Sequence, residues 1–171
     1  MNVLEPSNIV LVGFMGTGKS TVGKTLASRL GWKFVDTDAL IEERQGMSIS
    51  DIFATAGEKA FRDIESETIA ITLDGTRQVI ATGGGAVLAE QNRKVMQARG
   101  WVVALTADAE TIISRVSQDQ NRPLVQGDVK ERVHTLLETR KHAYDFAGKR
   151  IDTGSLSVEE IVAEIVAAMP N

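Results

Sequence analysis

The chain has 171 residues with a formal net charge of −4, and it contains no cysteine. This length predicts a single domain, residues 1–171, that buries about 70% of the surface its unfolded chain exposes. The absence of cysteine excludes disulfides, zinc–thiolate sites and thiol nucleophiles, and 23 acidic against 19 basic residues argue against a nucleic-acid-binding surface.

The sequence indicates a cytoplasmic protein that does not enter a membrane. Its first residues, MNVLEPSN, contain no basic segment followed by an apolar run, so no secretion signal is expected. The apolar runs are short, as in WVVAL at 101–105, whereas a membrane-spanning helix needs about 20 mainly apolar residues.

Short apolar segments alternate with longer segments that have helical periodicity. The expected strands are residues 9–12, 33–35, 79–81, 101–105 and 150–152. The expected helices are residues 19–30, 39–45, 48–73 with a break near Gly57, 90–99, 108–117, 129–145 and 157–169. Ser157, with Glu160 three residues later, is typical of the capping box that begins a helix. Such alternation predicts an α/β protein with a mostly parallel sheet covered by helices.

The first expected strand runs into GFMGTGKS at 13–20, which matches the phosphate-binding pattern G-x-x-x-x-G-K-[ST]. In this pattern, backbone N–H groups and the N-terminus of the next helix hold phosphate, and side chains at the glycines would obstruct it. Lys19 is expected to reach the β- and γ-phosphates, the Ser20 hydroxyl to bind Mg²⁺, and Thr21 to support the α-phosphate side. The expected nucleotide-binding residues of this segment are Gly13, Gly16, Thr17, Gly18, Lys19, Ser20 and Thr21.

The phosphate-binding pattern alone leaves several alternatives open. One is a strand–helix turn whose glycines serve packing only. A GTPase switch is disfavoured because no N-K-x-D guanine-binding motif follows, and a motor ATPase because such chains are usually longer and carry an intersubunit arginine.

Two carboxylates follow the second expected strand, in the segment FVDTDALIEER. If the extended conformation continues, Asp36 and Asp38 point the same way, and in an open α/β sheet this edge faces the ligand. One carboxylate can hold Mg²⁺, and the other can orient a substrate hydroxyl and accept its proton. Alternatively, Asp38 only caps a helix that begins at Ala39.

Two further motifs offer groups for a small anionic substrate. In GEKAFRDIESE, Arg62 and Glu65 lie on one helix face, so Glu65 can fix the guanidinium for a substrate carboxylate. The alternative is an ordinary surface ion pair. After the third strand, Gly83, Gly84 and Gly85 allow a ligand to lie against bare backbone, or else form a loop that needs positive φ.

The polar stretch SQDQNRPLVQGD at 117–128 is expected to form a lid or binding loop. Its Arg122 is kept out of helical conformation by the next proline, and it either closes over the γ-phosphate or is solvated. Arg115, on the preceding helix, either stacks on adenine or pairs with an acid. Arg140, with Tyr144 one helical turn later, either faces the ligand crevice or pairs on the helix surface.

Together these motifs resemble the shikimate kinase family. The resemblance covers nearly the whole chain, and it adds D-T-D, G-E-x-x-F-R-x-x-E, the triple glycine, R-P-L and R-x-x-x-Y to the phosphate-binding segment. It implies a three-layer α/β/α P-loop kinase with a five-stranded parallel sheet, similar to nucleoside monophosphate kinases. It also implies a helical substrate-binding region at about 36–65 and a lid at about 117–128.

The family transfers the γ-phosphoryl group of ATP to the 3-hydroxyl of shikimate, on the route to chorismate and the aromatic amino acids. The resemblance therefore implies ATP and shikimate as partners and Mg²⁺ as cofactor. It makes Lys19, Asp38 and Arg122 the catalytic residues, with Ser20 and Asp36 on Mg²⁺, Arg115 on adenine and Arg122 as the lid arginine. The implied shikimate-binding residues are Asp38, Arg62, Gly83, Gly84, Gly85 and Arg140. One departure is His142, which stands where the family often has proline.

Two other functions compete with this one. Gluconate kinase, another small P-loop kinase, shares the aspartate pair but typically lacks the triple glycine and the F-R-x-x-E helix. A nucleotide-dependent binding module without catalysis would not need Lys19, Ser20, Asp36 and Arg122 together. A monomer is expected, because no long apolar face is left over once the core is assigned.

Overall fold

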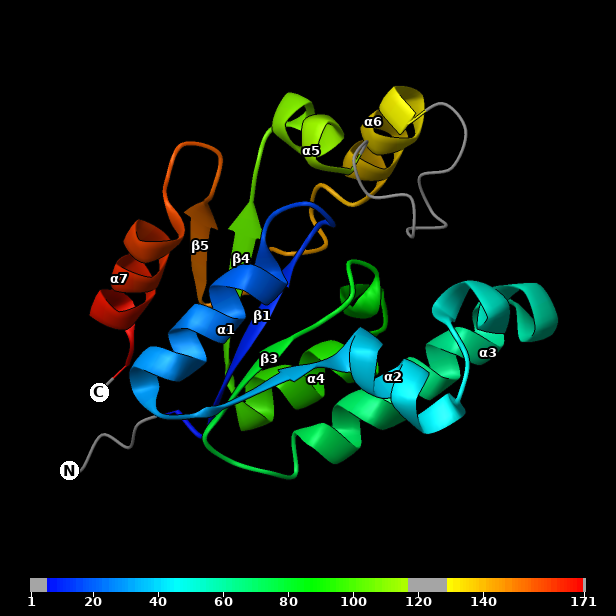
Figure 1. Cartoon of the computed structure of the whole chain (residues 1–171), viewed down its shortest axis with the longest axis horizontal. Coiled ribbons are helices and arrows are strands. Elements are labelled where there is room, and N and C mark those ends of the chain that lie inside the picture. Colours follow the sequence, from blue (N-terminus) through cyan, green and yellow to red (C-terminus); the bar gives the residue numbers. More distant parts are fainter. Residues whose placement is uncertain (1–5, 117–128, 171) are drawn as a thin grey trace.

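A five-stranded, fully parallel sheet forms the middle layer of the molecule (Figure 1). The structure is a computed structural model that describes residues 6–116 and 129–170. The strands are β1 (Asn8–Gly13), β2 (Lys33–Asp36), β3 (Gln78–Ala81), β4 (Trp101–Thr106) and β5 (Lys149–Asp152). Their order is β2-β3-β1-β4-β5, so the chain changes direction across the sheet at β1. Ligands of open α/β sheets bind at such a switch point, beyond the carboxyl ends of the strands.

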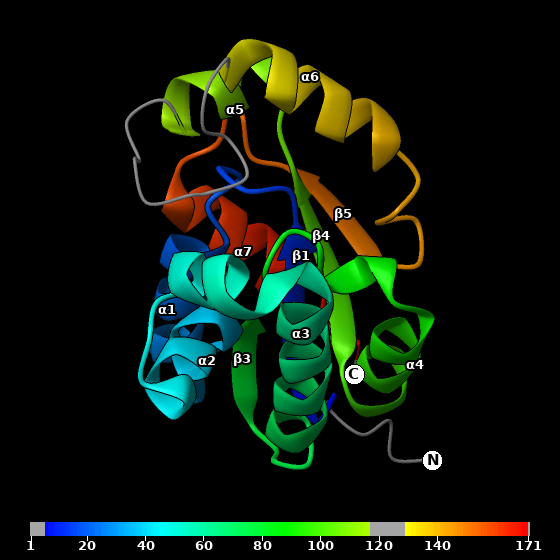
Figure 2. The ribbon, with the colours of Figure 1, turned by 90° about the vertical axis from the view of Figure 1, so that its right-hand side faces the viewer.

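Helices cover both faces of the sheet. They are α1 (Lys19–Leu30), α2 (Thr37–Gln45), α3 (Ile49–Thr72), α4 (Glu90–Arg99), α5 (Ala109–Val116), α6 (Val129–Thr139) and α7 (Val158–Ala168), with a 3₁₀ turn η1 (Ala86–Leu88). One face packs against α1 and α7, and the other against α3 and α4. Figure 2 shows α5 and α6 across the carboxyl end of the sheet, while α2 lies beside α3. The three-layer α/β/α architecture is thus confirmed.

The central strand β1 supplies both halves of the core. Ile9 and Leu11 join the cluster under α1 and α7, whereas Val10 and Val12 join the one under α3 and α4. All four side chains are fully buried, because alternate residues of a strand point to opposite faces and both faces of a parallel sheet are covered. This packing holds the carboxyl end of β1, where the phosphate-binding segment begins, in a fixed place.

The expected elements match the observed ones closely at most boundaries. Every expected strand agrees with its observed counterpart to within one residue at each end. Inside α3, Gly57 has φ 87° and ψ 170° and breaks the helix as predicted. The capping box of α7 is also confirmed, since the Ser157 hydroxyl accepts from the backbone of Glu160 and the Glu160 carboxylate accepts in return.

Two helix boundaries were predicted wrongly. Helix α2 begins at Thr37 rather than Ala39, because the carboxylate of Asp36 already caps it. Helix α6 ends at Thr139 rather than at residue 145. Beyond that point the backbone closes tighter i to i+3 turns, from Ala143 to Arg140 and onward. The expected helix 129–145 was therefore six residues too long.

Within the described parts of the chain, no helix combines the length and the apolar character that a membrane span requires.

Candidate active site

The phosphate-binding segment connects β1 to α1 and is braced from within. Gly16 and Gly18 have φ of 79° and 95°, in the left-handed region that favours glycine. The Thr17 hydroxyl donates to the Phe14 carbonyl at 2.7 Å, so this side chain holds the loop's shape. Gly18 is the N-cap of α1 and offers no side chain to the first turn, which leaves the backbone N–H groups there for an anion.

Gly13 also has positive φ, 147°, and it is required for a second reason. A Cβ at this position would collide with the backbone carbonyl of Leu105 on β4. Gly13 therefore allows the close passage of β1 past β4, and it is not among the residues that line the pocket described next.

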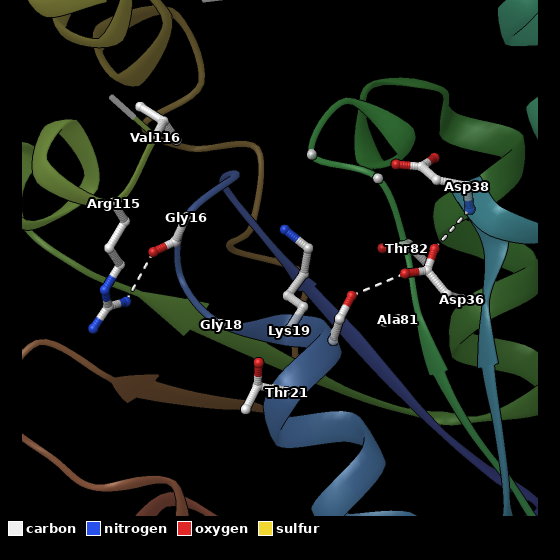
Figure 3. A pocket seen from close by; sticks show the side chains of 13 residues that line it. Gly16, Gly18, Lys19, Thr21, Asp36, Asp38, Ala81, Thr82, Arg115 and Val116 are labelled. Carbon is white, nitrogen blue, oxygen red and sulfur yellow. Dashed lines mark hydrogen bonds between the residues drawn. The ribbon is translucent and has the colours of Figure 1, made fainter. Parts of the chain in front are cut away.

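A polar pocket lies where the carboxyl ends of β1 and β3 meet the N-terminus of α1 (Figure 3). Its walls come from the phosphate-binding segment, the ends of β2 and β3, and α5. The lining residues are Gly16, Gly18, Lys19, Ser20, Thr21, Asp36, Asp38, Ala81, Thr82, Gly83, Gly84, Arg115 and Val116. The pocket thus brings most of the expected nucleotide-binding and metal-binding residues together with both aspartates.

Lys19 folds back over the loop that precedes it. Its Nζ donates to the carbonyls of Gly13 at 2.6 Å and Phe14 at 3.0 Å. The ammonium group is a point charge with three rotatable donors, so it can exchange these carbonyls for phosphate oxygens with little movement of its stem.

Ser20 and Asp36 meet across the pocket from two different elements. The Ser20 hydroxyl donates to Asp36 Oδ2 at 2.9 Å, while Asp36 Oδ1 accepts from the backbone N–H groups of Asp38 and Ala39. Asp36 is therefore the residue that caps α2, and the alternative that Asp38 is the cap is wrong. The extended conformation also does not continue past Asp36, yet both carboxylates line the pocket (Figure 3).

The oxygen ligands at Ser20 and Asp36 suit Mg²⁺ better than they suit a metal ion that is held by protein side chains alone. One hydroxyl and one carboxylate are hard oxygen ligands, which this ion prefers. In the described ranges, no group of three or more histidines or acidic residues is placed to hold a metal by itself. Mg²⁺ is commonly bound through one or two protein oxygens, with water and substrate phosphates completing its shell, and the pair matches that mode.

The triple glycine packs against side chains that were expected to bind the substrate. A Cβ on Gly83 would lie 2.9 Å from Asp38 Oδ1 and 3.2 Å from Glu65 Oε2. A Cβ on Gly84 would lie 3.5 Å from Arg140 Nη1, and one on Gly85 would overlap the Arg62 guanidinium. None of the three has positive φ, so the alternative of a strained turn is wrong. Gly83 and Gly85 are needed because charged side chains close directly onto their backbone, whereas a Cβ on Gly84 would make ordinary contacts.

Arg62 and Glu65 form a partly buried pair rather than a surface one. Arg62 Nη1 donates to Glu65 Oε1 at 2.9 Å, and the Glu65 side chain is only 1% exposed. Burial raises the pKa of the Glu65 carboxyl to about 7, against the opposing effect of the Arg62 charge. The guanidinium also lies over the Phe61 ring, with 5.2 Å between Cζ and the ring centroid, and this orients it further.

Arg140 is nearly buried, at 5% exposure, where α6 gives way to the following turns. Its Cζ lies 5.7 Å from the centroid of the Phe14 ring, which belongs to the phosphate-binding segment. Its Nη1 is buried and has no hydrogen-bond partner among the described residues. A buried cationic donor without a partner is costly, so this nitrogen marks a place for an anion.

Tyr144 lies beside Arg140, although not one helical turn along a helix as expected. Its hydroxyl donates to the Gly84 carbonyl at 2.8 Å, and burial raises its pKa to about 12. The phenol therefore stays neutral and ties the turns after α6 to the triple glycine.

The remaining expected residues lie at the edge of this site or outside the described ranges. Arg115 donates from Nη1 to the Gly16 carbonyl at 2.8 Å, and its Nη2 lies 3.4 Å from the Thr153 carbonyl. Its stacking on adenine stays a prediction. Arg122 and the expected lid, 117–128, lie outside the described residues.

Three residues with roles in the site were not found from the sequence. The Thr82 hydroxyl donates to the Leu11 carbonyl within the pocket wall, and the buried Thr153 hydroxyl donates to the Thr17 carbonyl at 2.9 Å. Both follow strands at the carboxyl edge, which is the rule that identified the aspartates. Phe14 occupies a variable position of the phosphate-binding pattern and carried no signal.

The fold and the phosphate-binding segment together define a small P-loop kinase. A family model described as shikimate kinase matches residues 15–170. Shikimate kinases of Geobacter sulfurreducens and Thermodesulfovibrio yellowstonii are 51% and 48% identical to the chain, over 92% and 93% of it and 88% and 92% of their own lengths. The chain belongs to the shikimate kinase family.

Solved structures agree with this assignment. A shikimate kinase from Acinetobacter baumannii in complex with shikimate superposes with a TM-score of 0.91 at 37% identity, over 94% of this chain and 91% of that one. A shikimate kinase from Aquifex aeolicus gives 0.82 at 35% identity, over 94% of both chains. The chain is therefore an enzyme, a kinase that uses ATP.

Proposed function

We propose that the pocket carries both halves of the family reaction, with a donor half on the phosphate-binding segment and an acceptor half around the triple glycine. The reaction itself follows from family membership: the γ-phosphoryl group of ATP is transferred to the 3-hydroxyl of shikimate, giving shikimate 3-phosphate and ADP. The observation that carries the proposed site is the buried, unpartnered nitrogen of Arg140 beside Gly84, because it calls for an anion such as the carboxylate of shikimate.

In the acceptor half, two guanidinium groups face the substrate carboxylate. We assign this role to Arg62 and Arg140, because the fork of arginine matches a carboxylate. Glu65 and the Phe14 ring hold the two forks in place, and Gly83, Gly84 and Gly85 let the substrate lie against backbone.

Asp38 is assigned to the reacting hydroxyl. Its carboxylate lines the pocket between the triple glycine and the phosphate-binding segment. From there it aligns the 3-hydroxyl toward the γ-phosphate and accepts its proton as the phosphoryl group is transferred.

In the donor half, the backbone between Gly13 and Ser20 holds the phosphates, and Thr17 keeps the shape of that loop. Lys19 moves from the carbonyls of Gly13 and Phe14 to the β- and γ-phosphate oxygens. Ser20 and Asp36 hold Mg²⁺, which supplies neutralisation of phosphate charge when bound. Thr21, at the mouth of the pocket, faces the α-phosphate side.

Two arginines complete the proposed nucleotide site. Arg115 braces Gly16 and Thr153 at the pocket edge, and we assign it to the adenine face. Arg122 is assigned to the γ-phosphate on sequence grounds alone. The division of the chain into one domain with a substrate-binding region at about 36–65 and a lid at about 117–128 is likewise proposed from the resemblance.

We further propose a cytoplasmic monomer that binds no nucleic acid and no membrane. The acidic composition supports the absence of nucleic-acid binding. The monomer is supported by the sequence, in which no long apolar face remains once the core residues are assigned. Light scattering of the purified protein at micromolar concentration should give the mass of one chain, and a dimer mass would contradict the proposal.

A coupled assay of ADP release tests the function. With ATP and Mg²⁺, turnover is expected when shikimate is added and not with gluconate or nucleoside monophosphates. Equal turnover with gluconate would contradict the assignment. Omitting Mg²⁺ should abolish turnover, and adding it back should restore turnover.

A further inference from the structure

Glu65 is a buried acid with one oxygen that nothing in the pocket satisfies. Its side chain is 1% exposed, and its Oε1 accepts from Arg62. Its Oε2 is buried and has no hydrogen-bond partner within the described part of the chain. This oxygen faces the backbone at Gly83, at the end of the pocket where the acceptor is proposed to lie.

The charges that face Glu65 come from three elements. Arg62 lies on the same helix, α3, and is itself approached by the exposed Glu58 at 3.6 Å. Asp38 faces it from α2, and Arg140 from the end of α6. The two arginines favour the ionised form of Glu65, whereas burial and Asp38 oppose it. Burial is the largest of these effects and raises the pKa to about 7.

A substrate carboxylate would change this balance in one direction. Bound between Arg62 and Arg140, it neutralises the two cations that keep Glu65 ionised, and it brings another negative charge to a buried site. Both effects favour the protonated form of Glu65. A neutral carboxyl group also gains an O–H donor, which an ionised carboxylate lacks.

We propose that Glu65 takes up a proton when shikimate binds, so that the acceptor site holds its anionic substrate with Glu65 neutral. The inference rests on the proposed function, because it requires the substrate carboxylate to lie on Arg62 and Arg140. Glu65 is thereby a positioning residue that sets the charge of the acceptor site, in addition to orienting Arg62.

Proton uptake makes shikimate affinity depend on pH with a definite sign. Below pH 7 Glu65 is already protonated in the free enzyme. Binding of shikimate then takes up few protons, and its dissociation constant changes little with pH. Above pH 7 the free enzyme must acquire the proton, and the dissociation constant rises by up to about tenfold per pH unit. The rise ends where Glu65 ionises in the complex as well.

Isothermal titration of the full-length enzyme with shikimate alone, without nucleotide, measures this uptake. At each pH the binding enthalpy is compared in phosphate and in Tris, which differ in ionisation enthalpy. Uptake of about half a proton is expected near pH 7, approaching one proton near pH 8. Glu65→Gln should remove the proton uptake, and its affinity for shikimate should not change with pH across this range. Glu67→Gln, at an exposed carboxylate on the same helix, should behave as the unmodified enzyme.

Each outcome decides between the two claims. If the enzyme binds shikimate with no proton uptake between pH 7 and 8, the inference is overturned while the proposed function stands. If the uptake persists in Glu65→Gln, the proton goes elsewhere and the inference is again overturned. If the enzyme does not bind shikimate at any pH, the proposed function fails instead. Should Glu65→Gln lose its fold by circular dichroism, the buffer comparison on the unmodified enzyme decides alone.

Discussion

Asp36 and Asp38 are separated by one residue and have different surroundings because a helix begins between them. Asp36 ends β2, caps α2 with Oδ1 and accepts from Ser20 with Oδ2. Only Oδ2 therefore contacts the phosphate-binding segment, while Oδ1 holds the start of α2. Asp38 lies in the first turn of α2 and faces Gly83. In the proposed reaction, this separation gives the metal to one carboxylate and the reacting hydroxyl to the other.

Substituting Asp38→Asn should lower kcat with little effect on the KM for ATP. The amide keeps the size of the side chain but cannot accept the hydroxyl proton, and general base catalysis contributes about 10²–10⁴-fold to a rate. Steady-state kinetics with both substrates varied gives the result. Near-normal kcat would remove Asp38 from the chemistry, and Asp63→Asn, at an exposed position of α3, serves as the control.

Arg140→Ala should raise the KM for shikimate by about 30-fold or more and leave the KM for ATP nearly unchanged. Removing one partner of a buried charge pair costs about 2–5 kcal/mol, and Arg140 is buried beside Gly84. Arg140→Lys should recover only part of the loss, since lysine lacks the fork. An unchanged KM for shikimate would place the carboxylate elsewhere. Arg44→Ala, at an exposed position of α2, is the matched control.

Among the secondary-structure elements, α1 and its glycine show how packing overrides propensity. Alanine in a helix interior is normally about 1 kcal/mol better than glycine. At Gly23, however, a Cβ would come within 2.5 Å of the Phe34 ring on β2 and 3.4 Å of Leu11. The close approach of α1 to the sheet therefore depends on this glycine.

Gly23→Ala should thus lower the free energy of unfolding, by about 1–3 kcal/mol, as overpacking does. Phe34→Leu in the same chain makes room for the new methyl group, so the double variant should be more stable than the sum of the single effects predicts. Urea unfolding of the unmodified protein, the two single variants and the double variant completes this double-mutant cycle. Additive effects, or a stabilising Gly23→Ala, would show that α1 does not approach β2 this closely.

The sequence predicted those elements whose signals are local. Apolar runs gave the strands, and Ser157 with Glu160 marked the start of α7 because a capping box involves only neighbours along the chain. The end of α6 was missed, since the turns there are held by a distant contact, the hydrogen bond from Tyr144 to Gly84. The start of α2 was missed because an Asp pair can cap at either position, and the contact with Ser20 decides between them.

For the whole molecule, the site was predictable as a set of residues but not as an arrangement. The arginines were expected from their own motifs and from the family resemblance. The rule that ligands bind at the carboxyl ends of the strands placed the glycines and the aspartates on one edge. It could not show that the Phe14 ring of the phosphate-binding loop lies under Arg140, across a sequence separation of 126 residues. It also could not show that charged side chains close onto the backbone of Gly83 and Gly85. Such contacts depend on packing between elements, which no local pattern encodes.

The two halves of the site should respond separately to their ligands even though they share one fold. A ligand at 100 times its dissociation constant adds about 2.7 kcal/mol to stability, which raises the melting temperature of a domain this size by roughly 5–10 °C. In the unmodified enzyme, shikimate and Mg²⁺-ADP should each produce such a shift, and gluconate should not. Lys19→Met should keep the shikimate shift and lose most of the nucleotide shift, whereas Arg62→Ala should do the reverse. If either variant lost both shifts while remaining folded, the donor and acceptor halves would not be separable in this way. Differential scanning fluorimetry at several ligand concentrations makes the comparison, and because each variant retains one ligand response, that response is its own control for an intact fold.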